Sequence, residues 1–187
     1  MHFMNSLNFN PENLIKLLKK QDASAQKFFY HQNAGRFLSV CRMYIRETMA
    51  AEDCLMHAFY KIFKNIGSYK ETGKLENWAR RIVINECLNY LKKHKTIFYL
   101  DENIPEIPEE IEDTEVNEEL DVQELLDELP TNFKLVFNLY VMENYSHKQI
   151  SETLNISVSS SKTQLFRAKE KLRFLFEQKK AKRHETL

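Results

Sequence analysis

The sequence SHKQISETLNISVSSSKTQLFRA at residues 146–168 predicts two helices joined by a tight turn. Ser146 with Gln149 three residues later is a capping box, a common start of a helix. Residues 155–157 (Asn-Ile-Ser) form the turn, and a second helical pattern starts at Val158. We therefore expect a helix-turn-helix in the C-terminal part of the chain.

The second helix of this pair has the composition of a helix that reads the major groove of DNA. One side is apolar, while small, polar and basic side chains are left for the other side. Such a helix is slim enough to enter the groove and supplies donors for bases and phosphates. An ordinary helical hairpin with a basic tail is the alternative. The side chains left outward, which we expect to contact DNA, are Ser160, Lys162, Thr163, Gln164, Arg167 and Lys171.

The scarcity of glycine and proline predicts an all-α fold. The 187 residues include three glycines and four prolines, the two residue types that most often interrupt helices. Gly35, Gly67 and Gly73 stand apart, so the chain lacks the clustered glycines that hold a nucleotide phosphate. This pattern argues against nucleotide hydrolysis and dinucleotide chemistry. We expect neither an enzyme nor a bound cofactor.

The three cysteines predict no metal site. Cys41, Cys54 and Cys87 are too few and too widely spaced in sequence for a disulfide framework or a paired Cys-x-x-Cys zinc site. Cys54 and His57 form only a lone Cys-x-x-His. We expect the cysteines to be reduced and to act as small residues of the core.

Charge is segregated along the chain, although 27 basic side chains balance 27 acidic ones. Residues 1–95 carry 16 Lys and Arg and 8 Asp and Glu (net +8). Residues 96–129 carry 14 acids and no base (net −14), and residues 130–187 carry 11 bases and 5 acids (net +6). Basic blocks beside an acidic one are typical of nucleic-acid surfaces and interaction segments.

The same pattern predicts two helical domains joined by an extended acidic linker. Repeated Glu, two prolines and little apolar periodicity indicate a self-repelling linker at residues 96–116. The first domain is then expected at residues 1–95 and the second at residues 117–187. In the second domain, an apolar face interrupted at Pro130 predicts two further helices before the helix-turn-helix.

Helix signals place four helices in the first domain. Two of them start at Pro11 and near Asp22, where Asn10 and Asp22 supply caps. Apolar spacing predicts the next helix at residues 51–66, with Gly67 as its terminator. A polar loop then leads to a helix at residues 75–93.

Two outer faces of the first domain carry unusual side chains. On the 75–93 helix, Asn77, Arg81, Asn85 and Asn89 recur every four residues and share one face. Asn and Arg can make paired hydrogen bonds to base edges, and Arg can stack on an unstacked base, so this face predicts a nucleic-acid surface. A mixture of acids and amphipathic side chains on the 51–66 helix indicates a protein-binding face: Glu52, Asp53, Met56, His57 and Tyr60.

Several segments resemble the extracytoplasmic-function (ECF) sigma factors of bacterial RNA polymerase. Residues 51–59 (AEDCLMHAF) are similar to the segment with which this family binds the polymerase core. Residues 78–85 (WARRIVIN) are similar to the segment used for opening and reading the minus-ten element. The resemblance extends from about Leu17 to Phe176. It includes the C-terminal domain, which reads the minus-thirty-five element, at Leu129-Pro130, Val136-Phe137, residues 146–154, Lys162 and Arg167-Ala168.

This resemblance implies a sigma factor without a catalytic site, which binds RNA polymerase core and directs promoter-specific initiation of transcription. It implies promoter DNA and an anti-sigma factor as further partners. With the resemblance, minus-thirty-five binding is expected at Ser159, Ser160, Ser161, Lys162, Thr163, Gln164, Arg167 and Lys171. Core-polymerase binding is expected at Glu52, Asp53, Leu55, Met56 and Phe59, and minus-ten binding at Asn77, Trp78, Arg80, Arg81, Asn85, Asn89 and Lys92.

The chain departs from the family pattern in both predicted domains. Met56 stands where Gln is common, and His57 stands where an acid is common. Residues 159–161 (Ser-Ser-Ser) replace a usual Gly-Thr-Val, and Gln164 replaces a common Arg. Since Ser161 forgoes an apolar packing contact, the base preference of the family does not transfer to this chain.

A second class of protein stays open on the residues alone. A stand-alone helix-turn-helix regulator, with an N-terminal dimerisation or sensor domain, would bind duplex DNA without polymerase. A hydrolase or metal enzyme is a third and remote alternative. No apolar run approaches the ~18 residues of a membrane span, and the first ten residues lack the pattern of a signal peptide. We therefore expect no membrane insertion and a cytoplasmic location.

Overall fold

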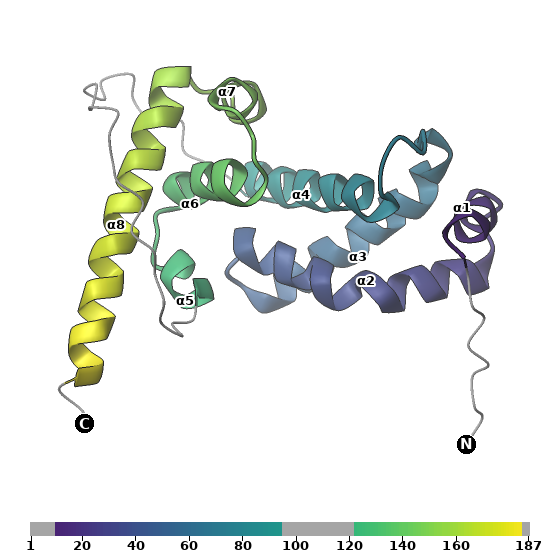
Figure 1. Ribbon diagram of the computed structural model, residues 1–187, viewed down its shortest axis with the longest axis horizontal. Helices are drawn as coiled ribbons and strands as arrows, with labels where there is room; N and C mark the ends of the chain where they lie inside the picture. The colour runs from purple at the N-terminus through teal and green to yellow at the C-terminus, as the bar shows by residue number, and fades with distance from the viewer. Residues whose placement is uncertain (1–9, 95–121, 185–187) are drawn as a thin grey trace. The chain divides into compact units, whose positions relative to one another are not determined.

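The computed structural model describes residues 10–94 and 122–184, and every regular element in these two ranges is helical (Figure 1). The all-α prediction is confirmed. The chain divides into two compact units, residues 1–90 and 91–187. The predicted acidic linker at residues 96–116 lies outside the described residues. Among the helices in the described ranges, none is long and apolar enough to cross a membrane.

Unit 1 contains the helices that the caps and the apolar spacing predict. Asn10 and Asp22 accept hydrogen bonds from backbone N–H groups three residues ahead and so cap the first two helices. Helices α2 and α3 pack against each other along their lengths (Figure 1). The elements are α1 (Pro11–Lys19), α2 (Ala23–Tyr44), α3 (Thr48–Asn65), the 3-10 turn η1 (Ile66–Ser68) and α4 (Leu75–Lys93).

Helix α3 begins three residues before the predicted start. The carboxylate of Glu47 accepts hydrogen bonds from the N–H groups of Met49 and Ala50, so Glu47 caps the helix at a position where Asn, Asp and Ser are more common. At the other end, α3 passes directly into the 3-10 turn that contains Gly67. Gly67 was predicted to end the helix, but it does not adopt the left-handed conformation with which glycine usually does so.

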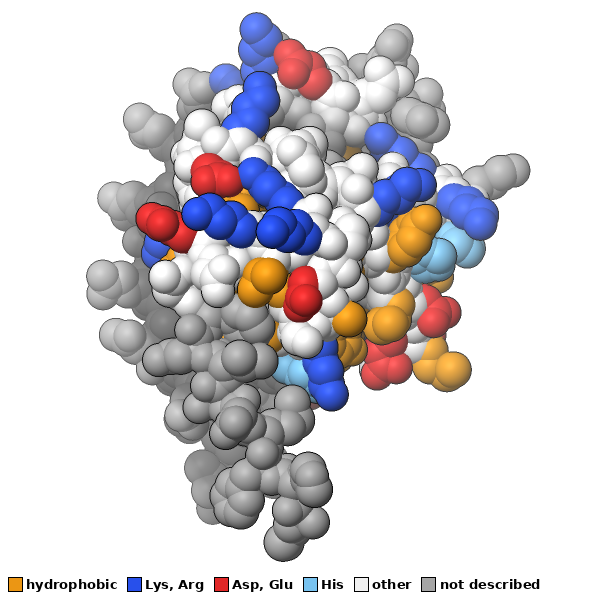
Figure 2. All heavy atoms as spheres, turned by 90° about the vertical axis from the view of Figure 1, so that its right-hand side faces the viewer, with side chains coloured by type: hydrophobic (Ala, Val, Ile, Leu, Met, Phe, Trp, Pro, Cys, Tyr) orange, Lys and Arg blue, Asp and Glu red, His pale blue; other side chains and the backbone are white. Residues whose placement is uncertain are grey.

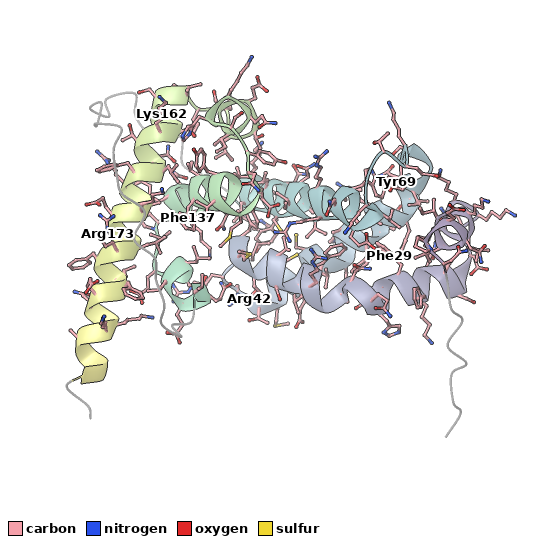
Figure 3. All side chains as sticks on the ribbon, in the orientation of Figure 1. Phe29, Arg42, Tyr69, Phe137, Lys162 and Arg173 are labelled. Carbon is pink, nitrogen blue, oxygen red and sulfur yellow. The ribbon has the colours of Figure 1, made fainter. Side chains whose placement is uncertain are left out.

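An aromatic cluster fills the core between α2 and α3. The ring of Phe29, which is labelled in Figure 3, meets Phe59 and Phe63 edge-on, with ring centroids 6.4 and 6.3 Å apart. The ring centroids of Phe37 and Phe59 lie 5.8 Å apart. Pairs of this kind contribute about 0.5–1.5 kcal/mol each beyond the area that they bury. The cluster fixes how α3 is rotated, and therefore which of its side chains remain outside.

The three cysteines are buried, as predicted, but they are not dispersed. Cys41, Cys54 and Cys87 come from α2, α3 and α4, and their sulfur atoms all lie within 4.8 Å of one another. The sequence separations conceal this arrangement because the three helices pack side to side. The fold thus brings together three cysteines that no short sequence motif connects.

Unit 2 ends on one long helix against which the shorter helices pack. As predicted, the helical structure is interrupted at Pro130, which immediately precedes the first residue of α6. Both α6 and α7 contact α8, drawn as the long yellow-green helix in Figure 1. The elements are α5 (Val122–Asp127), α6 (Thr131–Phe137), the π-helical turn η2 (Asn138–Met142), α7 (His147–Leu154) and α8 (Val158–His184).

An ion pair fastens α5 to α6 across the proline. The ammonium of Lys134 lies 2.6 Å from a carboxylate oxygen of Asp127, and only 6% and 14% of the two side chains are exposed. Removing one partner of such a pair leaves an uncompensated buried charge, which typically costs about 3–5 kcal/mol. The remaining core of the unit is apolar and includes Leu126, Leu135, Leu139, Ile150 and Leu154.

Candidate protein-binding and nucleic-acid-binding surfaces

The outer face of α3 mixes exposed apolar and acidic side chains. Met56 and Tyr60 are 56% and 62% exposed, although both side chains are large and hydrophobic. Glu52 and Asp53 lie exposed one turn earlier on the helix. Exposed hydrophobic side chains bordered by charge are typical of surfaces that bind another protein.

Two of the predicted polymerase-binding residues are part of the core instead. Leu55 is 5% exposed and Phe59 is 2% exposed, because both belong to the stripe that packs on α2. They fix the orientation of α3 beneath its outer face. The predicted apolar stripe is otherwise observed, with Ile62 and Ile66 buried and Phe63 half-buried.

A shallow groove beside this face was not anticipated from the sequence. It has a volume of about 350 Å³ and lies between α2 and α3. Tyr30 of α2 closes one side, with its ring 4.7 Å from the ring of Phe59 and its hydroxyl 4.0 Å from the sulfur of Met56. The groove combines apolar and polar side chains: Ala23, Gln26, Lys27, Tyr30, Met56, Phe59, Tyr60 and Phe63.

The outer face of α4 carries the predicted row of amide and basic side chains. Asn77, Arg81, Asn85 and Asn89 are all exposed, and Lys92 is exposed near the end of the helix. The four-residue spacing therefore places the row on the surface, as expected. The two remaining members of the predicted set, Trp78 and Arg80, are half-buried.

Contacts on the other sides of α4 hold this row in place. Lys61 of α3 forms a 2.6 Å ion pair with Glu86, whose carboxylate also accepts a 3.2 Å hydrogen bond from Asn89. The ring of Trp78 lies 5.6 Å from that of Tyr69, which is buried. The Tyr69 hydroxyl in turn donates a hydrogen bond to the carbonyl of Gly73.

The loop before α4 is basic and is anchored at both ends. Lys70 and Lys74 are exposed, and Glu71 forms a 2.6 Å ion pair with Lys19 of α1. Figure 2 views the molecule from the side on which α1 lies in Figure 1, and several Lys and Arg side chains gather there. Two exposed lysines of the loop, Lys70 and Lys74, therefore precede the N-terminal end of the α4 row.

In unit 2, local hydrogen bonds set the angle between α7 and α8. The predicted capping box is observed, with Ser146 and Gln149 bonded to each other's backbone N–H groups. Asn155 ends α7 in the left-handed conformation, at a φ of 55°. The Ser151 hydroxyl then donates to the carbonyl of Ile156, and Ser157 caps the start of α8 by accepting from the N–H of Ser160. The helix-turn-helix prediction is confirmed.

Three predicted DNA contacts on α8 are buried. The outward placement of Thr163 and Gln164 is wrong, and Ser161 occupies the packing position where the family pattern has an apolar residue. Ser161, Thr163 and Gln164 are 0%, 4% and 2% exposed. Their polar groups are bonded within unit 2: Ser161 lies 2.9 Å from a ring nitrogen of His147, Thr163 donates to the carbonyl of Ser159, and Gln164 donates to the hydroxyl of Ser160. Ser159, Lys162 and Lys171 are exposed, while Ser160 and Arg167 are half-buried.

His147 is a structural feature that the sequence did not reveal. It follows the α7 cap, its ring stacks on Tyr140 with centroids 4.6 Å apart, and its Nδ1 atom meets the hydroxyl of Ser161. Burial, together with the positive charge of Lys162, lowers the pKa of His147 below its ordinary value of 6.5. The ring therefore joins α7, α8 and the preceding helical turn in its neutral form.

The fold is a two-unit helical protein with a helix-turn-helix, and its candidate surfaces are the outer face of α3 and the exposed row on α4. Comparison with known families makes the class specific. Residues 29–97 match "Sigma-70 region 2", and residues 119–172 match "Sigma-70, region 4". The first range contains both α3 and α4, and the second contains the helix-turn-helix.

Curated relatives agree over most of the chain. The ECF RNA polymerase sigma factor SigW of Bacillus subtilis is 28% identical over 176 residues, which cover 85% of this chain and 92% of the relative. The ECF RNA polymerase sigma factor SigM of the same species is 28% identical over 131 residues, covering 67% and 79%. A solved structure of CnrH in complex with the cytosolic domain of CnrY has the same fold, with a TM-score of 0.50 at 15% identity, covering 89% of this chain and 97% of that one.

The chain belongs to the sigma-70 family and is an RNA polymerase sigma factor of the ECF group. As such it directs the polymerase to promoters. The stand-alone regulator receives no support, because the N-terminal half matches a sigma-factor region rather than a dimerisation or sensor domain.

Proposed function

We propose that this sigma factor divides its work among three surfaces: α3 with its groove binds the polymerase core, α4 binds the minus-ten element, and α8 binds the minus-thirty-five element. The observation that carries the proposal is the exposed row Asn77, Arg81, Asn85 and Asn89, which lies within the range matching sigma-70 region 2. In domain terms the proposal assigns residues 1–95, 96–116 and 117–187 to the first domain, the acidic linker and the second domain.

Core binding is assigned to Met56, Tyr60 and the acids Glu52 and Asp53. Burial of the apolar surface of Met56 and Tyr60 against a partner would favour binding. Glu52 and Asp53 supply negative charge at the rim of the contact. An apolar groove bordered by aromatic rings also suits an amphipathic helix. We therefore propose that an anti-sigma factor competes with the polymerase core for the α2–α3 groove.

Minus-ten recognition is assigned to the α4 row together with the loop at residues 67–74. Strand separation exposes bases that Arg can stack on and that Asn can read by paired hydrogen bonds. The loop lysines lie beside the row, where they can hold the phosphates of the displaced strand. Trp78 is half-buried against Tyr69, so we assign it a supporting role at this edge.

Minus-thirty-five recognition is assigned to the accessible part of α8: Ser159, Ser160, Lys162, Arg167 and Lys171. Arg can form a bidentate contact with guanine, and the lysines suit phosphates. Ser161, Thr163 and Gln164 leave the contact set because they are buried. They shape the helix-turn-helix from within.

The protein contributes binding surfaces and no catalytic group to transcription. RNA synthesis belongs to the polymerase, and the sigma factor acts where the polymerase acts, in the cytoplasm. No cofactor is required for this role.

Reconstitution with bacterial core polymerase tests the proposal. The full chain is mixed with core and a library of genomic DNA fragments, and the 5′ ends of the transcripts are sequenced. We expect new start sites that share two upstream motifs, spaced as minus-ten and minus-thirty-five elements are. Start sites identical to those of core alone would contradict the proposal.

A matched pair of variants tests the core-binding face separately. Met56→Asp removes an exposed apolar contact and should lower copurification with core by at least about tenfold, since burying one large apolar side chain contributes roughly 1.5–3 kcal/mol. Arg46→Asp, on an exposed residue outside the proposed face, should copurify normally. Helical circular dichroism should be unchanged in both variants. Equal copurification of the two would remove Met56 from the interface.

A further inference from the structure

The sulfur cluster in unit 1 has the dimensions of a three-coordinate binding site. Cys54 and Cys87 have sulfur atoms 3.6 Å apart, and Cys41 completes a set whose sulfurs lie within 4.8 Å of one another. A central atom bound to three sulfur ligands at ~2.3 Å, with angles between pyramidal (about 95°) and tetrahedral, holds the sulfur atoms about 3.4–3.8 Å apart. Small shifts of the three side chains would therefore bring all of them onto one central atom.

The cluster offers three ligands and no more. In residues 10–94 and 122–184, no His, Asp or Glu joins the three cysteines in the group. Structural zinc sites almost always have four protein ligands. His57 follows Cys54 by three residues, but its side chain is exposed, whereas Cys54 is 4% exposed. The geometry therefore favours an ion that is satisfied by three sulfur atoms.

Burial restricts the charge of that ion. Cys41 and Cys87 are 0% exposed, and the helices around them contribute apolar side chains such as Ala58, Val83 and Phe37. Three thiolates on a divalent ion leave a net charge of −1, and on a monovalent ion a charge of −2. An unpaired charge in such surroundings is strongly unfavourable. A trivalent centre leaves the complex neutral.

We propose that Cys41, Cys54 and Cys87 form a binding site for a trivalent, three-coordinate thiophilic centre, the class represented by arsenite. Three As–O bonds of arsenious acid are replaced by three As–S bonds. Each hydroxyl leaves as water with one proton, and the arsenic stays trivalent, so no oxidant or reductant takes part. The proposal is independent of how the surfaces of the sigma factor bind polymerase or promoter.

The three thiols lie close enough to shift one another's pKa. A hydrogen bond with Cys54, together with burial, raises the pKa of Cys41 to about 12. Hydrogen bonds with Cys41 and then Cys54, again with burial, raise the pKa of Cys87. The hydrogen bond with Cys41, followed by that with Cys87, lowers the pKa of Cys54. The three sulfur atoms therefore already contact one another, which is the arrangement that one shared central atom requires.

Titration of the full chain with sodium arsenite tests the site. The protein is kept reduced with a phosphine, and arsenic per chain is measured by mass spectrometry after gel filtration. Since the chain contains only these three cysteines, we expect one arsenic per chain and no binding elsewhere through sulfur. A sulfur-to-arsenic absorption band should appear in the near ultraviolet, and all three cysteines should become protected from alkylation.

Matched variants separate ligand loss from core damage. Cys54→Ala and Cys87→Ala should each weaken arsenic retention by at least about tenfold, which corresponds to one lost bond of roughly 1.4 kcal/mol or more in binding free energy. Val83→Ala removes a comparable volume from the same core, one turn before Cys87, and should retain one arsenic. Circular dichroism establishes that each variant is folded.

Three results would overturn the proposal: no arsenic retained by the wild-type chain, equal retention by Cys54→Ala, or tighter retention of zinc in a parallel titration. If a cysteine variant fails to fold, the test is alkylation of the wild-type chain after arsenite treatment. Cysteines that are still alkylated would contradict the proposed site. Protection of all three would support it.

Discussion

The row on α4 and the first turns of α8 are both proposed nucleic-acid surfaces, but they differ in how far a sequence pattern reveals them. On α4, the four residues spaced by four are all exposed. On α8, Ser161, Thr163 and Gln164 are buried among residues with similar polarity that are accessible. Polarity alone therefore identified the accessible face on one helix and failed on the other.

The difference follows from how each helix packs. The α4 row occupies one side of a helix whose opposite side carries Ala79, Val83 and Cys87, so inside and outside are separated by residue type. The start of α8 packs on α7 through a serine that is hydrogen-bonded to His147, so a polar residue lies where an apolar one is usual. A polar residue can be an interior residue when a neighbouring helix supplies its partner.

The largest effect that tests this comparison is expected on α4. The double variant Arg81→Ala, Asn85→Ala removes one cationic and one amide side chain from the exposed row. Because contacts of these kinds contribute roughly 1–3 kcal/mol each, open-complex formation should fall by at least about thirtyfold. Permanganate reactivity of thymines in the minus-ten region measures it.

The control for this variant is Arg46→Ala, which removes an exposed arginine from another part of unit 1. It should melt promoters normally. Normal melting by the double variant as well would remove the α4 row from the promoter surface. The α4 row would then differ from the start of α8 only in the exposure of its side chains, and not in DNA binding.

The next effect separates base contacts from phosphate contacts on α8. Arg167→Ala should weaken holoenzyme binding by about 1–3 kcal/mol, by an amount that varies with the minus-thirty-five sequence. Lys171→Ala should weaken binding about equally for all sequences and reduce the salt dependence by about one charge. Anisotropy titrations against a panel of promoters, repeated at several salt concentrations, measure both. A uniform loss for Arg167→Ala would assign it to the phosphates.

Much of the fold followed from local signals in the sequence. The caps at Asn10, Asp22 and Ser146 and the break at Pro130 each act within one turn of helix, so a single stretch of sequence contains the whole cause. The start of α3 was misplaced because Glu47 is an uncommon cap. These features decide where helices begin and say little about what surrounds them.

Features that need two or three helices could not be predicted in the same way. The groove depends on Tyr30 and Met56, which are 26 residues apart, and the sulfur cluster joins three helices. Leu55 and Phe59 were placed at the polymerase-binding face by family resemblance, although the apolar stripe to which they belong already indicated the core. In that case the physical pattern was the better guide to burial.

A smaller effect distinguishes interior from surface serines at the start of α8. Ser161→Ala removes the hydroxyl that meets His147 and should lower the free energy of unfolding by about 0.5–1.5 kcal/mol, with promoter affinity retained. Ser159→Ala alters an exposed serine and should leave unfolding unchanged while promoter affinity falls. Denaturant titration and anisotropy measure the two quantities. The opposite assignment of effects would show that Ser161 faces the DNA.

The smallest effect concerns pH. His147 has a pKa below 6.5 in the folded protein because of burial and the charge of Lys162. The unfolded chain therefore binds a proton more readily than the folded one, so the contribution of this group to stability is complete above about pH 6.5 and is lost as the pH falls through the folded pKa. His147→Gln should remove this part of the pH dependence, and Lys162→Gln should reduce it. Unfolding midpoints of the wild type and of His147→Gln, measured from pH 7.5 to 5, test the sign. If acidification stabilises the wild type relative to His147→Gln, the folded state favours protonated His147 and the assignment is wrong.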